Sequence, residues 1–181
     1  MTDHPPVSPD DLFEDAYRSS GTAVLGYALR RSVSREDALD VMAETFATAW
    51  RRRTDMPADP QEVRPWLFGI ARRCLANTAR STARAGRLGA RLADSLAGAA
   101  IPDPSTFHEN RADSRLVHEA LEQLSSEDRE LVTLIAWEGL TPAEAGTALG
   151  LSAGTARVRL HRARTRLRIS LLTSRRTDHD H

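Results

Sequence analysis

The organisation of the chain is clearest in residues 141–168, which have the sequence TPAEAGTALGLSAGTARVRLHRARTRLR. Thr141 can cap a short helix that begins with a proline, and Glu144 completes a capping box. We expect that helix to end at Gly150, and Ser152 can cap a longer basic helix after it. Two helices joined by a tight turn that contains glycine are typical of a helix-turn-helix, whose second helix enters the major groove of DNA.

The second helix of this motif has an apolar face and a basic face. Its inward residues are predicted to be Ala156, Leu160, Ala163 and Leu167. The N-terminal part of a recognition helix reads the bases, so we expect Thr155, Val158, Arg159 and Arg162 to lie near base edges. Arg157 lies to the side, where a phosphate contact is expected. The alternative is a basic surface helix that packs on protein or binds RNA.

The charged residues are unevenly distributed. The chain has 25 basic residues, all of them arginine, and 25 acidic ones, so the net charge is zero. Residues 64–91 contain seven arginines and no acid, and residues 145–176 contain eight arginines and no acid. Between them, residues 92–144 contain eleven acids and three arginines. Two basic blocks separated by an acidic one indicate an anionic partner at two places on the molecule.

A helix in the N-terminal half is predicted to start at Ser34, which forms a capping box with Asp37. Helical spacing places one apolar stripe inward, made of Leu39, Met42, Phe46, Ala49 and Trp50. The opposite face then presents Asp37, Asp40, Val41 and Glu44. This acidic face is either a binding surface or simply a solvated side of the helix.

The next helix is predicted to start near Pro65, because proline is favourable at the first position of a helix. Its buried face consists of Leu67, Ile70, Ala71 and Cys74. Another face carries Arg73, Arg80, Arg84 and Arg87, with Trp66 and Asn77 at its edge. Guanidinium groups bind phosphates, and an indole ring can stack on an unpaired base, so this face suits a nucleic-acid strand. Alternatively, Trp66 belongs to the core and the arginines are solvated.

These patterns predict an all-α protein with two small helical domains joined by a flexible linker. The predicted segments are a tail at 1–9, an N-terminal domain at 10–91, a linker at 92–112, a helix-turn-helix domain at 113–173 and a tail at 174–181. In the second domain, a helix over 113–124 is expected to bury Leu116, Val117, Ala120, Leu121 and Leu124. A further helix, capped by Ser125 with Asp128, is expected to extend through Trp137, with Leu131, Leu134, Ile135 and Trp137 on its buried side.

Composition excludes several classes of protein. No stretch approaches the ~20 apolar residues of a membrane span, and the N-terminus does not have the pattern of a secretion signal. A single cysteine, Cys74, allows neither an internal disulfide nor a cysteine-cluster zinc site, so a cytoplasmic location is expected. Neither a catalytic triad nor a metal-ligand spacing stands out, and we expect no enzyme activity, cofactor or metal.

Two blocks resemble a known family. DALDVMAETFATAWRRR at 37–53, followed by VRPWLFGIARRCLANTAR at 63–80, resembles the promoter-melting domain of bacterial extracytoplasmic-function (ECF) sigma factors. The block ALEQLSSEDRELVTLIAWEGLTPAEAGTALGLSAGTARVRLHRARTRL at 120–167 resembles their C-terminal helix-turn-helix domain. A stand-alone helix-turn-helix regulator of the response-regulator output type is the alternative, but it leaves WLFGIAR at 66–72 and the acidic face unexplained.

The resemblance implies a dissociable specificity subunit of bacterial RNA polymerase. Its docking face for the clamp coiled coil of the largest polymerase subunit would comprise Asp37, Asp40, Val41, Glu44 and Thr45. Its −10 element would be read and melted by the helix that carries Trp66, Arg73, Asn77, Arg80 and Arg84, and the −35 element would be read as duplex by the recognition helix. An anti-sigma inhibitor that wedges between the domains is a further implied partner.

This chain departs from the family pattern at Arg73. Many relatives have asparagine after an Ile-Ala-x run, where this chain has Ile70-Ala71-Arg72-Arg73. Arginine is a donor only and cannot copy the two-sided hydrogen bonding of an amide. Base preference at the −10 element is therefore in doubt, whereas attraction to phosphate is retained.

Overall fold

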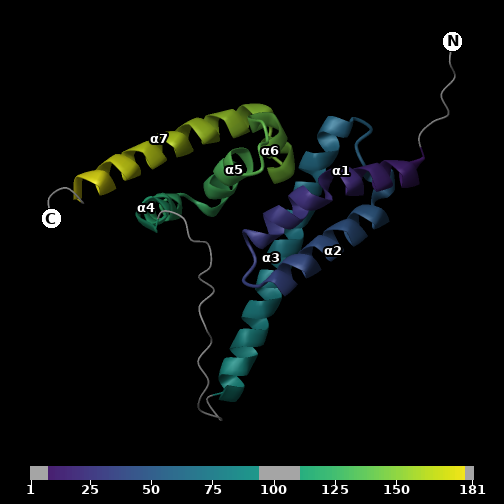
Figure 1. Ribbon diagram of the computed structural model, residues 1–181, viewed down its shortest axis with the longest axis horizontal. Coiled ribbons are helices and arrows are strands. Elements are labelled where there is room, and N and C mark those ends of the chain that lie inside the picture. The colour runs from purple at the N-terminus through teal and green to yellow at the C-terminus, as the bar shows by residue number, and fades with distance from the viewer. Residues whose placement is uncertain (1–7, 94–110, 178–181) are drawn as a thin grey trace. The chain divides into compact units, whose positions relative to one another are not determined.

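A computed structural model describes residues 8–93 and 111–177 (Figure 1). In these two ranges the chain forms seven α-helices and one 3-10 helix and no strand, which confirms the predicted all-α class. The chain divides into two compact units, Met1–Pro104 and Ser105–His181. Most of the predicted linker, together with residues 1–7 and 178–181 of the predicted tails, lies outside the described residues. The first described helix starts at Pro9 and the last one ends at Thr177, so each helix extends into a segment that was predicted to be a tail.

The first unit is a three-helix bundle with a short 3-10 turn. It contains α1 (Pro9–Leu29), α2 (Arg35–Arg51), η1 (Arg53–Asp55) and α3 (Pro60–Ala93). The helices α1 and α2 pack on each other, and both pack on α3. Their shared core includes Tyr27 and Phe68, which are at most 1% exposed and whose ring centroids lie 5.2 Å apart.

The helix α3 begins at Pro60, so the predicted start near Pro65 is wrong. Asp59 precedes this start, and its side-chain oxygen accepts a 2.9 Å hydrogen bond from the backbone N–H of Gln61. Pro65 lies inside the helix and is buried; a proline there removes one backbone hydrogen bond. The predicted inward face is confirmed, since Leu67, Ile70, Ala71 and Cys74 are all buried.

The buried face of α2 is shifted around the helix from the face that its sequence pattern predicted. Leu39 and Trp50, predicted to point inward, are 43% and 41% exposed. Val41 and Thr45, predicted to lie on the outward face, are 1% and 0% exposed. Both predictions are wrong, because the contacts of α2 with α1 and α3, and not the apolar pattern of α2 alone, decide which side of the helix is buried.

The second unit contains α4 (Arg111–Glu122), α5 (Ser126–Ala136), α6 (Pro142–Leu149) and α7 (Ala153–Thr177). The long helix α7 packs on the other three. Leu121, Leu124, Leu131, Leu134 and Ala163 are buried in this unit. Val117 and Trp137 were expected to be buried as well, but they are 46% and 50% exposed. Trp137 follows the last residue of α5, where the helix no longer directs it toward the core.

The helix-turn-helix of α6 and α7 has the predicted local structure. Thr141 and Glu144 form the capping box: the Thr141 N–H donates to Glu144 Oε2 at 2.6 Å, and the Glu144 N–H donates to Thr141 Oγ1 at 3.3 Å. Gly150 ends α6 with a φ of 71°, a left-handed conformation that favours glycine. A Cβ at Gly146 would lie 3.1 Å from Ala156 Cβ, so this glycine allows α6 to approach α7 closely.

Candidate nucleic-acid interface

The N-terminal half of α7 presents the predicted base-reading side chains to solvent. Thr155, Arg157 and Arg162 are exposed, and Val158 is 51% exposed. Ala156, Leu160 and Ala163 are buried on the opposite side, which confirms how the two faces divide. Thr155 lies in the first turn, where its backbone N–H donates to the capping Ser152 Oγ at 3.1 Å. The exposed face thus combines a hydroxyl, an apolar side chain and arginines, which are the groups that read base edges.

Arg159, one of the predicted readers in α7, is held by an ion pair within its own unit. Its Nη1 donates to Glu127 Oε2 in the first turn of α5. This hydrogen bond, together with the charge of Glu127, raises the pKa of the Arg159 guanidinium. Two turns along α7, Arg166 Nη1 lies 3.5 Å from Asp128 Oδ2. Asp128 was predicted only as the capping partner of Ser125, and the sequence pattern did not indicate that Glu127 or Asp128 would pair with arginines of α7.

The basic face of α3 is partly organised by contacts between its own side chains. Arg73, Asn77 and Arg80 are exposed, as predicted. Arg80 Nη2 donates to Asn77 Oδ1 at 2.6 Å, and Arg80 Nε donates to the Ala76 carbonyl at 3.1 Å. Arg84 lies further along the α3 backbone, and its side chain is outside the described part of the chain. The Asn77 amide and the Arg80 guanidinium therefore form one hydrogen-bonded polar group, which begins one helical turn after Arg73.

Trp66 is half-buried near the start of this face. The guanidinium of Arg52, which follows α2, lies 6.0 Å from the Trp66 ring centroid. Arg52 is also paired with Asp55, with Nε 3.2 Å from Oδ2. An indole ring with an arginine over it is a suitable platform for an unpaired base. Arg52 had not been identified from sequence, because nothing in the local pattern shows that the turn after α2 returns to α3.

The acidic face of α2 is narrower than predicted. Asp40 and Glu44 are exposed, whereas Asp37 is half-buried and its Oδ2 accepts a 2.7 Å hydrogen bond from the capping Ser34 hydroxyl. Glu44 Oε1 accepts from Arg51 Nη2 at 2.7 Å and from Thr48 Oγ1 at 3.1 Å. These bonds, chiefly that from Arg51, lower the pKa of the Glu44 carboxyl from its ordinary value.

Val41 and Thr45 lie beneath this acidic face and not on it. The Thr45 hydroxyl donates to the Val41 carbonyl at 2.6 Å inside the bundle. Cys74 of α3 is a hydrogen-bond partner of Thr45, and burial raises the pKa of its thiol. A residue without exposed surface cannot contact a docked protein directly. The predicted polymerase-binding set is thereby reduced to the three carboxylates, with Val41 and Thr45 as their support.

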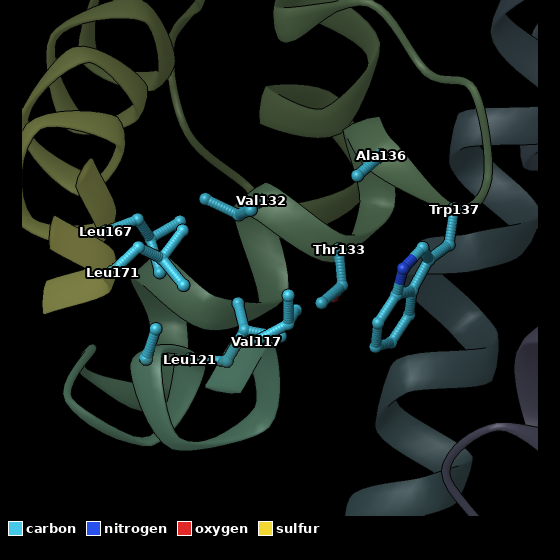
Figure 2. A pocket seen from close by; sticks show the side chains of 9 residues that line it. Val117, Leu121, Val132, Thr133, Ala136, Trp137, Leu167 and Leu171 are labelled. Atoms are coloured by element: carbon cyan, nitrogen blue, oxygen red, sulfur yellow. The ribbon is translucent and has the colours of Figure 1, made fainter. Parts of the chain in front are cut away.

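The second unit also has an apolar pocket of about 130 Å³ on its surface (Figure 2). Figure 2 shows Trp137 on one side of it and Leu167 with Leu171 on the other. Its lining comprises Val117, Ala120, Leu121, Val132, Thr133, Ala136, Trp137, Leu167 and Leu171. An exposed apolar surface of this kind marks an interaction site more often than an isolated apolar residue does.

Within the ranges 8–93 and 111–177, no group of His, Cys, Asp and Glu side chains could hold a metal ion. In the same described ranges, no helix has the length and apolar character needed to cross a membrane.

Comparison with known proteins matches both units to one class. Residues 16–85 match the model of sigma-70 region 2, and residues 114–167 match the model of sigma-70 region 4. "ECF RNA polymerase sigma factor SigL" of Mycobacterium tuberculosis is 32% identical over 88% of this chain and 89% of its own length. "RNA polymerase sigma-E factor" of Streptomyces avermitilis is 33% identical over 88% of this chain and 84% of its own.

Two solved structures are similar over most of this chain, and each contains a second protein. One is CnrH in complex with the cytosolic domain of CnrY, with a TM-score of 0.59, 25% identity and coverage of 89% of this chain and 88% of the other. The second is the sigma factor RpoE in complex with the anti-sigma factor NepR from Bartonella quintana, with a TM-score of 0.58, 25% identity and coverage of 88% and 96%.

The fold and these matches define a transcription initiation factor built from a helical bundle and a helix-turn-helix unit. Within that class, the chain belongs to the ECF sigma factors of the sigma-70 family. Members of this family bind core RNA polymerase and promoter DNA. The stand-alone regulator is the weaker interpretation, because it does not account for a first unit that matches region 2.

Proposed function

We propose that this chain binds core RNA polymerase through α2 and directs initiation at promoters that α3 and α7 contact at two separate elements. The observation that carries the proposal is the presence of two different basic helical faces in one chain. The face on α7 belongs to a helix-turn-helix, which suits duplex DNA. The face on α3 combines Trp66, Asn77 and arginines, which suits an unpaired strand. As a partner of the polymerase, the chain would act in the cytoplasm.

At the −35 element, α7 would enter the major groove with its N-terminal half. Thr155, Val158, Arg159 and Arg162 would lie at base edges, and Arg157 would contact a phosphate. An arginine that bridges O6 and N7 of guanine contributes about 1–3 kcal/mol of discrimination against another base. Val158 is exposed without a polar group, so it suits a thymine methyl group.

At the −10 element, the half-buried Trp66 and the arginine beside it would hold an unpaired base of the non-template strand. Arg73, Arg80 and Arg84 follow on α3 and would attract the phosphates of that strand. The Asn77 amide, already joined to Arg80, would provide the polar contact to a base edge. Arg73 would act as a phosphate contact, because its guanidinium is a donor only.

The polymerase contact would be electrostatic. Asp40 and Glu44 are exposed one helical turn apart on α2, and Asp37 begins the same face. The proposed partner is the clamp coiled coil of the largest polymerase subunit, which would present basic side chains to these carboxylates. Arg51 pairs with Glu44 in the unbound chain, and docking would exchange that arginine for one of the partner.

Arg162→Ala tests the duplex contact in α7. We expect the variant holoenzyme to lose roughly 5- to 150-fold in affinity for its −35 duplex, with a much smaller loss on unrelated duplex. Competition binding against unlabelled DNA measures both values. Arg168→Ala is the matched control, because Arg168 is also exposed on α7 but lies beyond the base-reading half. An equal loss on every sequence would mean that Arg162 contacts phosphate alone.

We also propose that an anti-sigma protein inhibits this chain, as the complex of the sigma factor RpoE with the anti-sigma factor NepR suggests by analogy. The apolar pocket beside Val117 and Trp137 is its proposed contact on the second unit, since it lies away from the N-terminal half of α7. Affinity purification from the native host should recover core polymerase subunits and a small inhibitor. The Val117→Arg variant should no longer recover the inhibitor but should still recover the polymerase. If the variant recovered both, the assignment of the pocket as the inhibitor's contact would be contradicted.

A further inference from the structure

The ion pair between Glu127 and Arg159 connects the first turn of α5 to the base-reading half of α7. The two residues are 32 positions apart in sequence, and Arg159 Nη1 donates to Glu127 Oε2. The side chain of Arg159 is 35% exposed and that of Glu127 is 63% exposed. The pair therefore lies at the surface of the second unit, beside the face that the proposed function assigns to DNA.

The contact leaves one edge of the guanidinium available. The hydrogen bond to Glu127 uses Nη1, whereas the Nε–Nη2 edge is a second pair of parallel donors on the same plane. Guanine offers O6 and N7 as two acceptors on its major-groove edge, and such a donor pair matches them. Arg159 can thus keep its carboxylate partner and bind a guanine at the same time.

We propose that Glu127 is a positioning residue that holds the Arg159 guanidinium with its Nε–Nη2 edge toward a guanine of the bound duplex. The proposal rests on the proposed function, and it adds a specificity-determining residue from outside the recognition helix. An arginine side chain has many rotamers, and fixing them before binding removes an entropic cost that otherwise weakens the contact. A guanine contact gains from this, whereas a phosphate accepts a guanidinium from many directions.

A second ion pair connects α5 and α7 near the first one. Arg166 Nη1 lies 3.5 Å from Asp128 Oδ2, two turns further along α7. Asp128 is well covered, with its side chain 13% exposed, and its N–H donates to the capping Ser125 hydroxyl at 3.2 Å. This part of α5 is therefore anchored, and Glu127 is presented to Arg159 from a fixed backbone. Because surface pairs add little to stability, removing the Glu127 carboxylate should leave the fold intact.

The test is a binding selection with the full chain assembled on core polymerase. A promoter fragment with a randomised −35 region is the probe, and sequencing of the retained DNA gives the preference at each base pair. Wild type should enrich guanine at one position, and Arg159→Ala should lose that enrichment. Glu127→Ala should reduce it roughly three- to tenfold while total retention of DNA stays equal or rises, since one acid is gone. Glu127→Gln keeps an acceptor oxygen, so its guanine enrichment should lie between that of wild type and that of Glu127→Ala.

Two further variants and the outcomes that would contradict the proposal complete the test. Glu122→Ala removes an exposed acid from α4 of the same unit and should leave the guanine preference unchanged. Adding Glu127→Ala to Arg159→Ala should change the preference no further. If Glu127→Ala raised total retention of DNA but kept the wild-type guanine preference, Glu127 would only repel DNA, and the proposal would be wrong. Reduced retention of all sequences by Glu127→Ala would also overturn the proposal. If wild type itself enriched no sequence, the proposed function would fail first.

Discussion

Replacing both Asp40 and Glu44 by arginine is expected to weaken binding to core RNA polymerase roughly 100-fold, because like charges forced together at an interface cost several kcal/mol. Both side chains are exposed on α2, and neither contributes to the core of the first unit. The change also removes the carboxylate that pairs with Arg51, so the positive charge of Arg51 is no longer balanced by Glu44. Titration of labelled chain with core enzyme measures the loss.

The matched control for this experiment is a double charge reversal on α1. Glu14→Arg with Asp15→Arg changes the net charge by the same amount at two exposed positions of the same unit. Its affinity for core polymerase should stay within a few-fold of wild type. Equal losses in the two double variants would show that total charge, and not the α2 face, governs docking.

Phe68→Ala is expected to lower the free energy of unfolding of the first unit by about 3–5 kcal/mol, as large-to-small changes of buried aromatic residues do. The ring is 1% exposed and packs on Tyr27, with 5.2 Å between centroids. Denaturant unfolding followed by tryptophan fluorescence measures the change. A Trp137→Phe background removes the signal of the second unit and leaves Trp50 and Trp66 to report on the first.

A surface position on the neighbouring helix provides the control for Phe68. Leu39 is 43% exposed on α2, so Leu39→Ala should cost less than about 1 kcal/mol. A cost for Phe68→Ala as small as that of Leu39→Ala would contradict the packing of α1, α2 and α3 described above.

The starts of α2, α5, α6 and α7 were predictable because their determinants lie within a few residues of one another, whereas the start of α3 was not. Ser34, Ser125, Thr141 and Ser152 each accept a hydrogen bond from the backbone N–H three residues later. The left-handed Gly150 and the apolar face of α7 follow equally from local pattern. These features sufficed to predict the all-α class and the helix-turn-helix.

Burial on a given helix was harder to predict, since it depends on how many neighbours that helix has. Val41 and Thr45 were predicted to be exposed but are covered, because α2 contacts two helices. The pair between Glu127 and Arg159 was missed for a related reason. It connects residues 32 positions apart, and no spacing rule within one helix predicts such a contact.

Run-off transcription with purified core RNA polymerase tests the central claim most directly. Genomic fragments from the native host serve as templates, with and without the added chain. We predict discrete transcripts that appear only when the chain is present and that disappear with the Asp40→Arg, Glu44→Arg double variant. A chain that neither binds core polymerase nor directs initiation on any fragment would contradict the account.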